Sequence, residues 1–367
     1  MSKFRKAART TAGIYKVNQT TLGAVRLPVP PTNEQRRIAS ALENQLWAVG
    51  RSLEDLRPLE RHLEHLEESV IHAAVLGRLV PGTLSATPAA VHLAAALDAV
   101  PAPDTLNLPA LPSSWTWTTL GALCEVTGGV TKDAKKQGDA SYVEMPYLRV
   151  ANVQKGWLDL DEVARIRVPS AKAEALRLLP GDVLFNEGGD RDKLGRGWVW
   201  EGQIPSCIHQ NHVFRGRIRG GVLDPRLLSW HGNTFGRRWF EAAGKQTTNL
   251  ASLSMTNLKR LPVPVPPLED QPVIVAEVER RLSIIRATRN DITAVRSRTQ
   301  MLRRALLHAA SAGRLVDQDA TDEPAELVLK RLAEDRAATA PTTRRRRART
   351  VPTARQDMAA ELVEESA

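Results

Sequence analysis

The chain has 367 residues, and its 51 Lys and Arg outnumber its 41 Asp and Glu to give a net charge of +10. That balance favours a polyanionic partner, most simply nucleic acid, and the length predicts two or more domains. Neither a membrane span nor a signal peptide is predicted, and two cysteines, Cys124 and Cys207, are too few for a disulfide framework, so we expect a cytoplasmic protein with no membrane partner.

One long stretch occurs twice. LPVPP at 27–31 and HAAVLGRLV at 72–80 return as VPVPP at 263–267 and HAASAGRLV at 308–316, so that Pro31 corresponds to Pro267 and Gly77 to Gly313. Between these ends the identity is low, but apolar positions stay in register. A repeat of this kind predicts that residues 27–80 and 263–316 share one fold.

Each copy is predicted to hold a long amphipathic helix. Apolar residues from Gln35 to Ala74 are separated alternately by three and four positions, which keeps one narrow stripe in line and requires a partner helix. The second copy supplies that partner, and Pro58 predicts a local kink in the first helix. The residues expected to pack between the helices are Leu46, Val49, Leu56, Leu66, Leu282, Ile285, Ile292 and Leu302.

Residues 1–26 resemble the end of a domain. They match 246–261 at the offset of the repeat, for example Thr11 with Thr247, so we expect 1–26 to be the remnant of a first globular domain whose larger part is missing. Residues 81–111 are rich in proline around a short helix expected at 89–99, which predicts a short helix and an extended linker.

Residues 112–262 are predicted to form a complete globular domain. They hold seven of the eight tryptophans and the largest share of the excess positive charge. Short β-like runs, at 147–150, 164–168, 182–185, 197–200 and 212–218, alternate with turns, and 225–242 is predicted to be helical. The fold class expected is α+β, one globular domain of mixed strands and helices beside two long helices.

Three loops of this domain are candidates for nucleic-acid contact. The first, 128–136, carries Lys132, Lys135 and Lys136 for phosphates, or is a solvated turn. The second, 186–197, offers Asn186, Arg191, Lys193 and Arg196 among glycines, and it lacks the Lys and Ser/Thr of a P-loop. Alternatives for it are a structural loop or, through its carboxylates, a metal-dependent nuclease.

The third loop, 207–214, offers Gln210 and Asn211 to DNA. Its Cys207, His209 and His212 are zinc-type ligands, but structural zinc sites draw on two ligand pairs, so core or turn residues are the simpler interpretation and no metal site is predicted. Motifs of methyltransferases, dinucleotide binders and P-loop enzymes are missing, so no catalytic residue is predicted. In 317–367 we expect a short helix near 323–337 and a disordered tail with basic and acidic stretches.

These motifs together resemble one family. PYLRVANVQKGWLDL, PGDVLFNEGGDRDKLGRGWVW, IHQNHVF and QTTNLASLSMTNLKRLPVPVPPLEDQ are similar to the specificity (S) subunits of type I restriction-modification systems. The resemblance implies target recognition domains that read double-stranded DNA, two antiparallel coiled-coil helices that bind methyltransferase (M) subunits, and a restriction (R) subunit as a further partner. It implies no cofactor in this chain, with S-adenosylmethionine, ATP and Mg in the partner subunits.

The resemblance leaves alternatives open. The missing part of a first recognition domain fits either a truncated, non-functional remnant or a chain that works with a second S chain. A coiled-coil scaffold without DNA contact, or a stand-alone nuclease or methyltransferase, would fit the same elements differently.

Overall fold

The computed structural model describes residues 9–11, 14–16, 19, 23, 26–80, 82, 85–104, 107–189, 195–243, 245–247 and 250–339. The chain divides into two compact units, one of residues 1–51 with 300–367 and one of residues 52–299. The two long helices contribute residues to both units.

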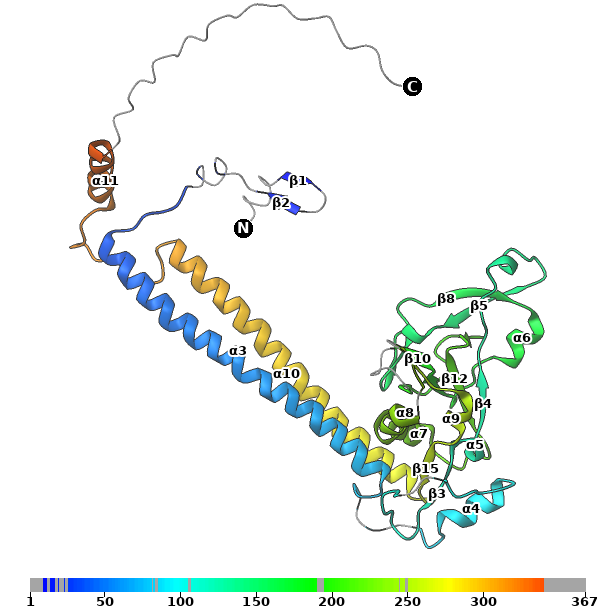
Figure 1. Ribbon diagram of the computed structural model, residues 1–367. Helices are drawn as coiled ribbons and strands as arrows, with labels where there is room; N and C mark the ends of the chain where they lie inside the picture. The colour runs from blue at the N-terminus through cyan, green and yellow to red at the C-terminus, as the bar shows by residue number, and fades with distance from the viewer. Residues whose placement is uncertain are drawn as a thin grey trace, which may run out of the picture. The chain divides into compact units, whose positions relative to one another are not determined.

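The repeat forms two long helices, α3 (Thr32–Val75) and α10 (Gln271–Ser311) (Figure 1). α3 passes through Pro58 without a break in the helix. Both end at a glycine with positive φ, 69° at Gly77 and 65° at Gly313, a backbone conformation that glycine adopts without steric cost. A hydrogen bond at the start of each helix also repeats. Gln35 Nε2 donates to the Pro30 carbonyl, and Gln271 Nε2 donates to the Pro266 carbonyl.

The two helices are antiparallel where they pair in the larger unit. Glu60 of α3 bonds Arg296 of α10 and Glu67 bonds Arg289, so the numbering falls along one helix as it rises along the other. The α+β class with long helices is therefore confirmed.

The line of contact differs in part from the expected one. The half-buried or buried residues of α3 run through Leu56, Glu60, Leu63, Glu67 and Val70, in steps of four and three. Leu66 and its equivalent Leu302 lie beside this line and are 45% and 51% exposed, so their expected packing between the helices is wrong. Beside Leu66, the contact position is held by Glu67, whose carboxylate pairs with Arg289. Of the other residues expected there, Val49, Ile285 and Ile292 are buried, and Leu46, Leu56 and Leu282 are half-buried.

Several small sheets build the 112–262 domain. β12 (Val213–Ile218) lies between β4 (Cys124–Gly128) and β9 (Val183–Asn186), antiparallel to both. β5 (Val143–Leu148) lies between β8 (Ala164–Val168) and the parallel β11 (Ile208–His209). Residues 197–200, expected as a strand, contribute only a bridge from Val199 to Val183. β6 (Val153–Gln154) pairs with β7 (Trp157–Leu158), and β14 (Leu250–Ser252) lies between β10 (Gly188–Gly189) and β13 (Lys245–Thr247) in a third three-stranded sheet.

The helices of the domain are short. They are α5 (Leu120–Leu123), α6 (Ser170–Ala175), α7 (Pro225–His231), the π-helical turn η4 (Gly232–Gly236), α8 (Arg237–Ala243) and α9 (Met255–Lys259), with the 3₁₀ turns η1 (Ala134–Lys136) and η2 (Val150–Asn152). The helix expected over 225–242 is therefore α7 and α8 joined through a π turn. α4 (Ala89–Ala96) precedes the domain.

The PVPV segment before α10 belongs to the domain as well as to the repeat. It forms β15 (Pro262–Val265), which pairs with β3 (Thr116–Thr119). Val263, Val265 and Ile274 then pack in the same hydrophobic core as Val70 and Ala74 of α3. Gln271 fixes the junction, because its Nε2 donates to the Val222 carbonyl and its Oε1 accepts from the Asp224 amide. One core thus holds the ends of both helices to the domain.

The smaller unit contains the hairpin β1 (Arg9–Thr11) and β2 (Ile14–Lys16), the other ends of the long helices, and α11 (Ala325–Thr339). Arg37 pairs with Asp322 at 2.7 Å. The PVPP segment of the smaller unit, at 27–31, is exposed. Leu27 and Val29 are 76% and 44% exposed, whereas their equivalents Val263 and Val265 are fully buried. The residues after 339 lie outside the described part, so the disordered tail stays a prediction.

Candidate nucleic-acid interface

The base of the first loop is tied to the third. The Val130 amide donates to the His209 carbonyl at 2.9 Å, and the Asn211 amide donates to the Val130 carbonyl at 3.0 Å. Gly129 makes this approach possible, because a Cβ there would lie 2.1 Å from the His209 carbonyl oxygen. The third loop therefore holds the first in a fixed place.

The third loop is tied in turn to the described start of the second. The Glu187 amide donates to the His212 carbonyl at 2.9 Å, and the Glu187 carboxylate lies 2.6 Å from His212 Nδ1. At the other end of the second loop, the Asn186 amide donates to the Arg196 carbonyl and the Gly195 amide to the Asn186 carbonyl. The bases of all three loops thus meet, although Lys132 of the first loop and Asn186 of the second are 54 positions apart in the sequence.

Lys132 and Lys135 are both exposed on the first loop. The Asp133 carboxylate accepts a hydrogen bond from the Lys135 amide and starts a 3₁₀ turn, which orders this part of the loop. Ordered, exposed ammonium groups of this kind suit phosphate contact. Lys136 lies in the same turn, but its side chain is outside the described residues.

Gln210 and Asn211 are half-buried on the third loop. The side-chain Nδ2 of Asn211 lies 3.3 Å from His212 Nε2, and the Gln210 backbone amide donates to the Leu148 carbonyl at 2.8 Å. Their backbone is fixed while their side chains remain partly accessible to a ligand.

Asn186 takes a structural position instead. It is fully buried, and its Nδ2 donates to the carbonyl oxygens of Val153 and Val150. It therefore holds the turn at 150–153 against β9 and is not exposed to a ligand in this structure. Arg196 is half-buried, and Arg191 and Lys193 lie outside the described residues.

His209 and Cys207 belong to the interior of the domain. His209 Nδ1 donates to the Val213 carbonyl at 2.6 Å, and burial lowers the pKa of this histidine to about 4. Burial also raises the pKa of the Cys207 thiol to about 12, so the thiolate form is suppressed. Within the described ranges, no group of three or more His, Cys, Asp and Glu is placed to hold a metal ion.

Two ion pairs, each with one buried member, stiffen the sheet beneath the loops. Arg215 on β12 is 2% exposed and bonds the Glu125 carboxylate and two backbone carbonyls, of Ala175 and Arg177. Arg217 binds the buried Asp182 through two hydrogen bonds, at 2.7 and 2.8 Å. This network was not expected from the sequence, because charged residues on a strand are ordinarily placed on its solvent face.

A second polar region, also not expected, lies between α3 and η4–α8. It gathers His72 and Glu68 with Arg237 and Arg238, and Lys155 pairs with Glu68 beside it at 2.7 Å.

Among the described helices, none is long and apolar enough to cross a membrane.

Comparison with known proteins identifies several relatives, although no family model matches the chain. It is 21% identical over 337 residues to the type I restriction enzyme EcoKI specificity subunit of Escherichia coli (strain K12), which covers 89% of this chain and 67% of the relative. It is 22% identical to the EcoBI specificity subunit of Escherichia coli, over 90% of this chain and 69% of that one.

A solved structure shares the fold. It comes from work on the complex assembly and conformational transition of the type I R-M system, and it aligns with a TM-score of 0.55 at 20% identity over 78% of this chain and 61% of the other. The chain thus spans roughly two thirds of the length of the proteins it resembles.

Proposed function

We propose that this chain, a relative of the specificity subunits of type I restriction enzymes, is a sequence-specific DNA-binding subunit that brings methyltransferase and restriction subunits to a target site. The observation that carries the proposal is that the bases of the three loops are hydrogen-bonded to one another on the 112–262 domain. Residues distant in sequence then present cations and amides together to one ligand.

In this proposal the first loop fixes position and the other two read sequence. Lys132 and Lys135 contact phosphates, which adds affinity without sequence preference. Gln210 and Asn211 offer donors and acceptors to base edges, and Arg191 and Lys193 of the second loop are proposed to contact the same DNA. The ion pairs of the buried Arg215 with Glu125 and of Arg217 with the buried Asp182 keep the platform rigid.

The long helices are proposed to bind the M subunits, because their outward faces carry exposed side chains that their own pairing does not use. Among them are Trp47, Ile284 and Met301. The chain itself is proposed to be non-catalytic, with S-adenosylmethionine, ATP and Mg²⁺ bound by the partner subunits.

A second S chain is part of the proposal. The helices pair about equivalent residues of the repeat, and Leu27 and Val29 are exposed where their equivalents are covered by β3. Two copies related by a two-fold axis would offer two recognition domains, and their site would be palindromic, because protein symmetry is mirrored in the DNA.

The test is binding of the purified chain, alone and with its co-expressed methyltransferase, to mixed duplexes over a range of salt. For a DNA-binding subunit, the logarithm of the binding constant falls linearly as the logarithm of the salt concentration rises. Affinity that does not change with salt, or methyl transfer by the chain without a partner, would contradict the proposal.

A further inference from the structure

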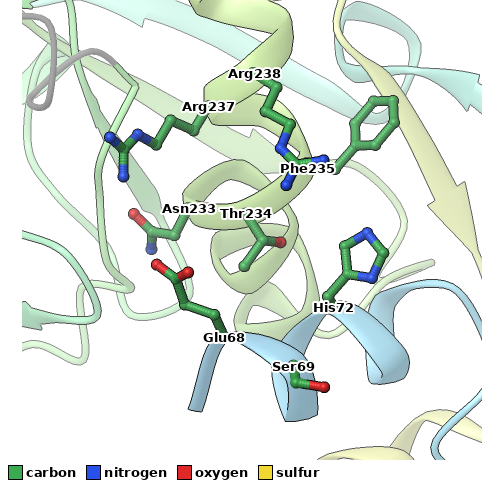
Figure 2. A pocket seen from close by; sticks show the side chains of 8 residues that line it. All are labelled: Glu68, Ser69, His72, Asn233, Thr234, Phe235, Arg237 and Arg238. Atoms are coloured by element: carbon green, nitrogen blue, oxygen red, sulfur yellow. The ribbon is translucent and has the colours of Figure 1, made fainter. Parts of the chain in front are cut away.

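A basic pocket of about 420 Å³ lies between α3 and the π turn that leads into α8. Figure 2 shows the side chains that line it, three from α3 and five from η4 and α8. The lining residues are Glu68, Ser69, His72, Asn233, Thr234, Phe235, Arg237 and Arg238. None of them belongs to the three loops.

The π turn is anchored to the domain by its own polar groups. Asn233 Oδ1 accepts from the Gly197 amide at 3.0 Å, and its Nδ2 donates to the Gly197 carbonyl at 2.8 Å. Thr234 Oγ1 donates to the Trp230 carbonyl at 2.8 Å. These two side chains are therefore occupied in building the turn, which presents the two following arginines to the pocket. Single π turns inside α-helices are frequent at functional sites.

The carboxylate in the pocket is already neutralised. Glu68 pairs with Lys155, whose Nζ lies 2.7 Å from Oε1, and this pair lowers the pKa of Glu68, with a further contribution from Arg237. Because Lys155 already pairs with Glu68, this carboxylate leaves the charge of Arg238 available in the pocket.

Arg238 has no hydrogen bond or ion pair with any residue that the structure describes, and it is exposed. Its charge acts on His72, because the pKa of His72 is lowered first by burial and then by the charges of Arg238 and Arg78. The charges of Arg238 and Arg78, which add to burial in disfavouring the protonated histidine, would stabilise an anion bound beside it.

We propose that the basic pocket binds a phosphate group between Arg238, Arg237 and His72. Guanidinium groups bind phosphate oxygens through paired N–H donors, and the Ser69 hydroxyl at the rim adds a further donor. The phosphate is that of the DNA backbone or a free phosphate. The first source rests on the proposed function, whereas phosphate binding as such does not.

The first arm of the test uses inorganic phosphate and the full-length protein. The His72 side-chain resonances are followed by NMR against pH, with and without phosphate. We expect a saturable response and a higher His72 pKa with phosphate, lost in Arg238→Gln. Arg280→Gln is the matched control, since it removes the same charge from an exposed residue of α10 that pairs with Glu277.

The second arm measures duplex binding against salt for the same three proteins. A lost phosphate contact lowers the slope of log K against log salt by about 0.9, which corresponds to roughly fivefold weaker binding at 0.15 M salt. We expect this loss for Arg238→Gln on every duplex sequence, and not for Arg280→Gln.

The outcomes separate the two proposals. A His72 response to phosphate with unchanged duplex binding assigns the pocket to free phosphate, while loss of both assigns it to DNA. No response to phosphate together with an unchanged salt slope overturns the pocket proposal, even if the chain binds DNA well. Failure of the wild type to bind any duplex contradicts the proposed function, and the phosphate arm then still decides the pocket.

Discussion

Glu60 and Arg296 are equivalent residues of the two repeat copies, and they pair with each other across the two long helices at 2.6 Å. A residue that meets its own equivalent lies on the two-fold axis relating the copies. The Glu67–Arg289 pair, at 2.9 Å, lies one heptad away in the same register. Two ion pairs thus lie within a line of contact that is otherwise largely apolar.

Replacing this pair with leucines should stabilise the protein. Both side chains are about one third exposed, so their ion pair contributes at most about 1 kcal/mol, whereas two leucines at contact positions would bury apolar area. We expect Glu60→Leu with Arg296→Leu to raise the free energy of unfolding by about 1–2 kcal/mol in urea denaturation. A double variant less stable than the wild type would show that the pair holds the helices more strongly than its exposure implies.

An acidic residue in the line of contact should separate the helices. Ile292 is buried, so Ile292→Asp places a carboxylate in an apolar contact at a cost of about 3–5 kcal/mol, and Leu56→Asp should act in the same direction. Leu66→Asp is the matched control, because Leu66 is exposed and its replacement should change the free energy of unfolding by less than about 1 kcal/mol. Thermal unfolding and M-subunit pulldown measure both effects. Equal losses in all three variants would contradict the line of contact described here.

The protein should lose stability in mild acid. Burial lowers the pKa values of His209 and His231 to about 4, below the value of about 6.5 in the unfolded chain. Their contribution is complete above pH 6.5 and is lost as the pH falls toward 4, because only the unfolded chain takes up the protons. At pH 5 each histidine should cost about 2 kcal/mol relative to pH 7. Urea denaturation at both pH values measures the loss, and His209→Gln should remove about half of it.

The first loop should supply affinity without selectivity. Lys132→Ala with Lys135→Ala should weaken binding to all duplexes alike and reduce the salt slope by up to about 1.8, about 0.9 for each contact. Arg191→Ala should weaken DNA binding while M-subunit binding stays intact. Fluorescence anisotropy on cognate and scrambled duplexes measures DNA binding, and pulldown measures M-subunit binding. A selective loss on one sequence after the lysine replacements would give the first loop a reading role instead.

The helices could be predicted well from sequence because their signals are local. The 3–4 spacing and the terminal glycines place α3 and α10 to within a few residues, since spacing and capping act over one or two turns. The exchange of Leu66 for Glu67 in the contact could not be predicted, because Glu67 becomes a contact residue only when Arg289 of a distant segment neutralises it.

The candidate interface could be predicted in part, because the composition of each loop is also a local signal. Loop composition pointed to Lys132, Lys135 and Gln210, which the structure leaves accessible. Asn186 has the same composition signal but is buried, because its amide is needed by the carbonyls of 150–153. The basic pocket gave no sequence signal, since His72 and Arg238 lie 166 positions apart and meet only through the junction of α3 with the domain.

The most direct test of DNA-sequence recognition is methylome sequencing of a host that carries this chain and its methyltransferase as the only such system. The account predicts one methylated motif that disappears when the chain is deleted, and a palindromic motif if two copies act together. A non-palindromic bipartite motif assigned to this chain alone would contradict the two-copy arrangement. No chain-dependent methylated motif at all would contradict the account.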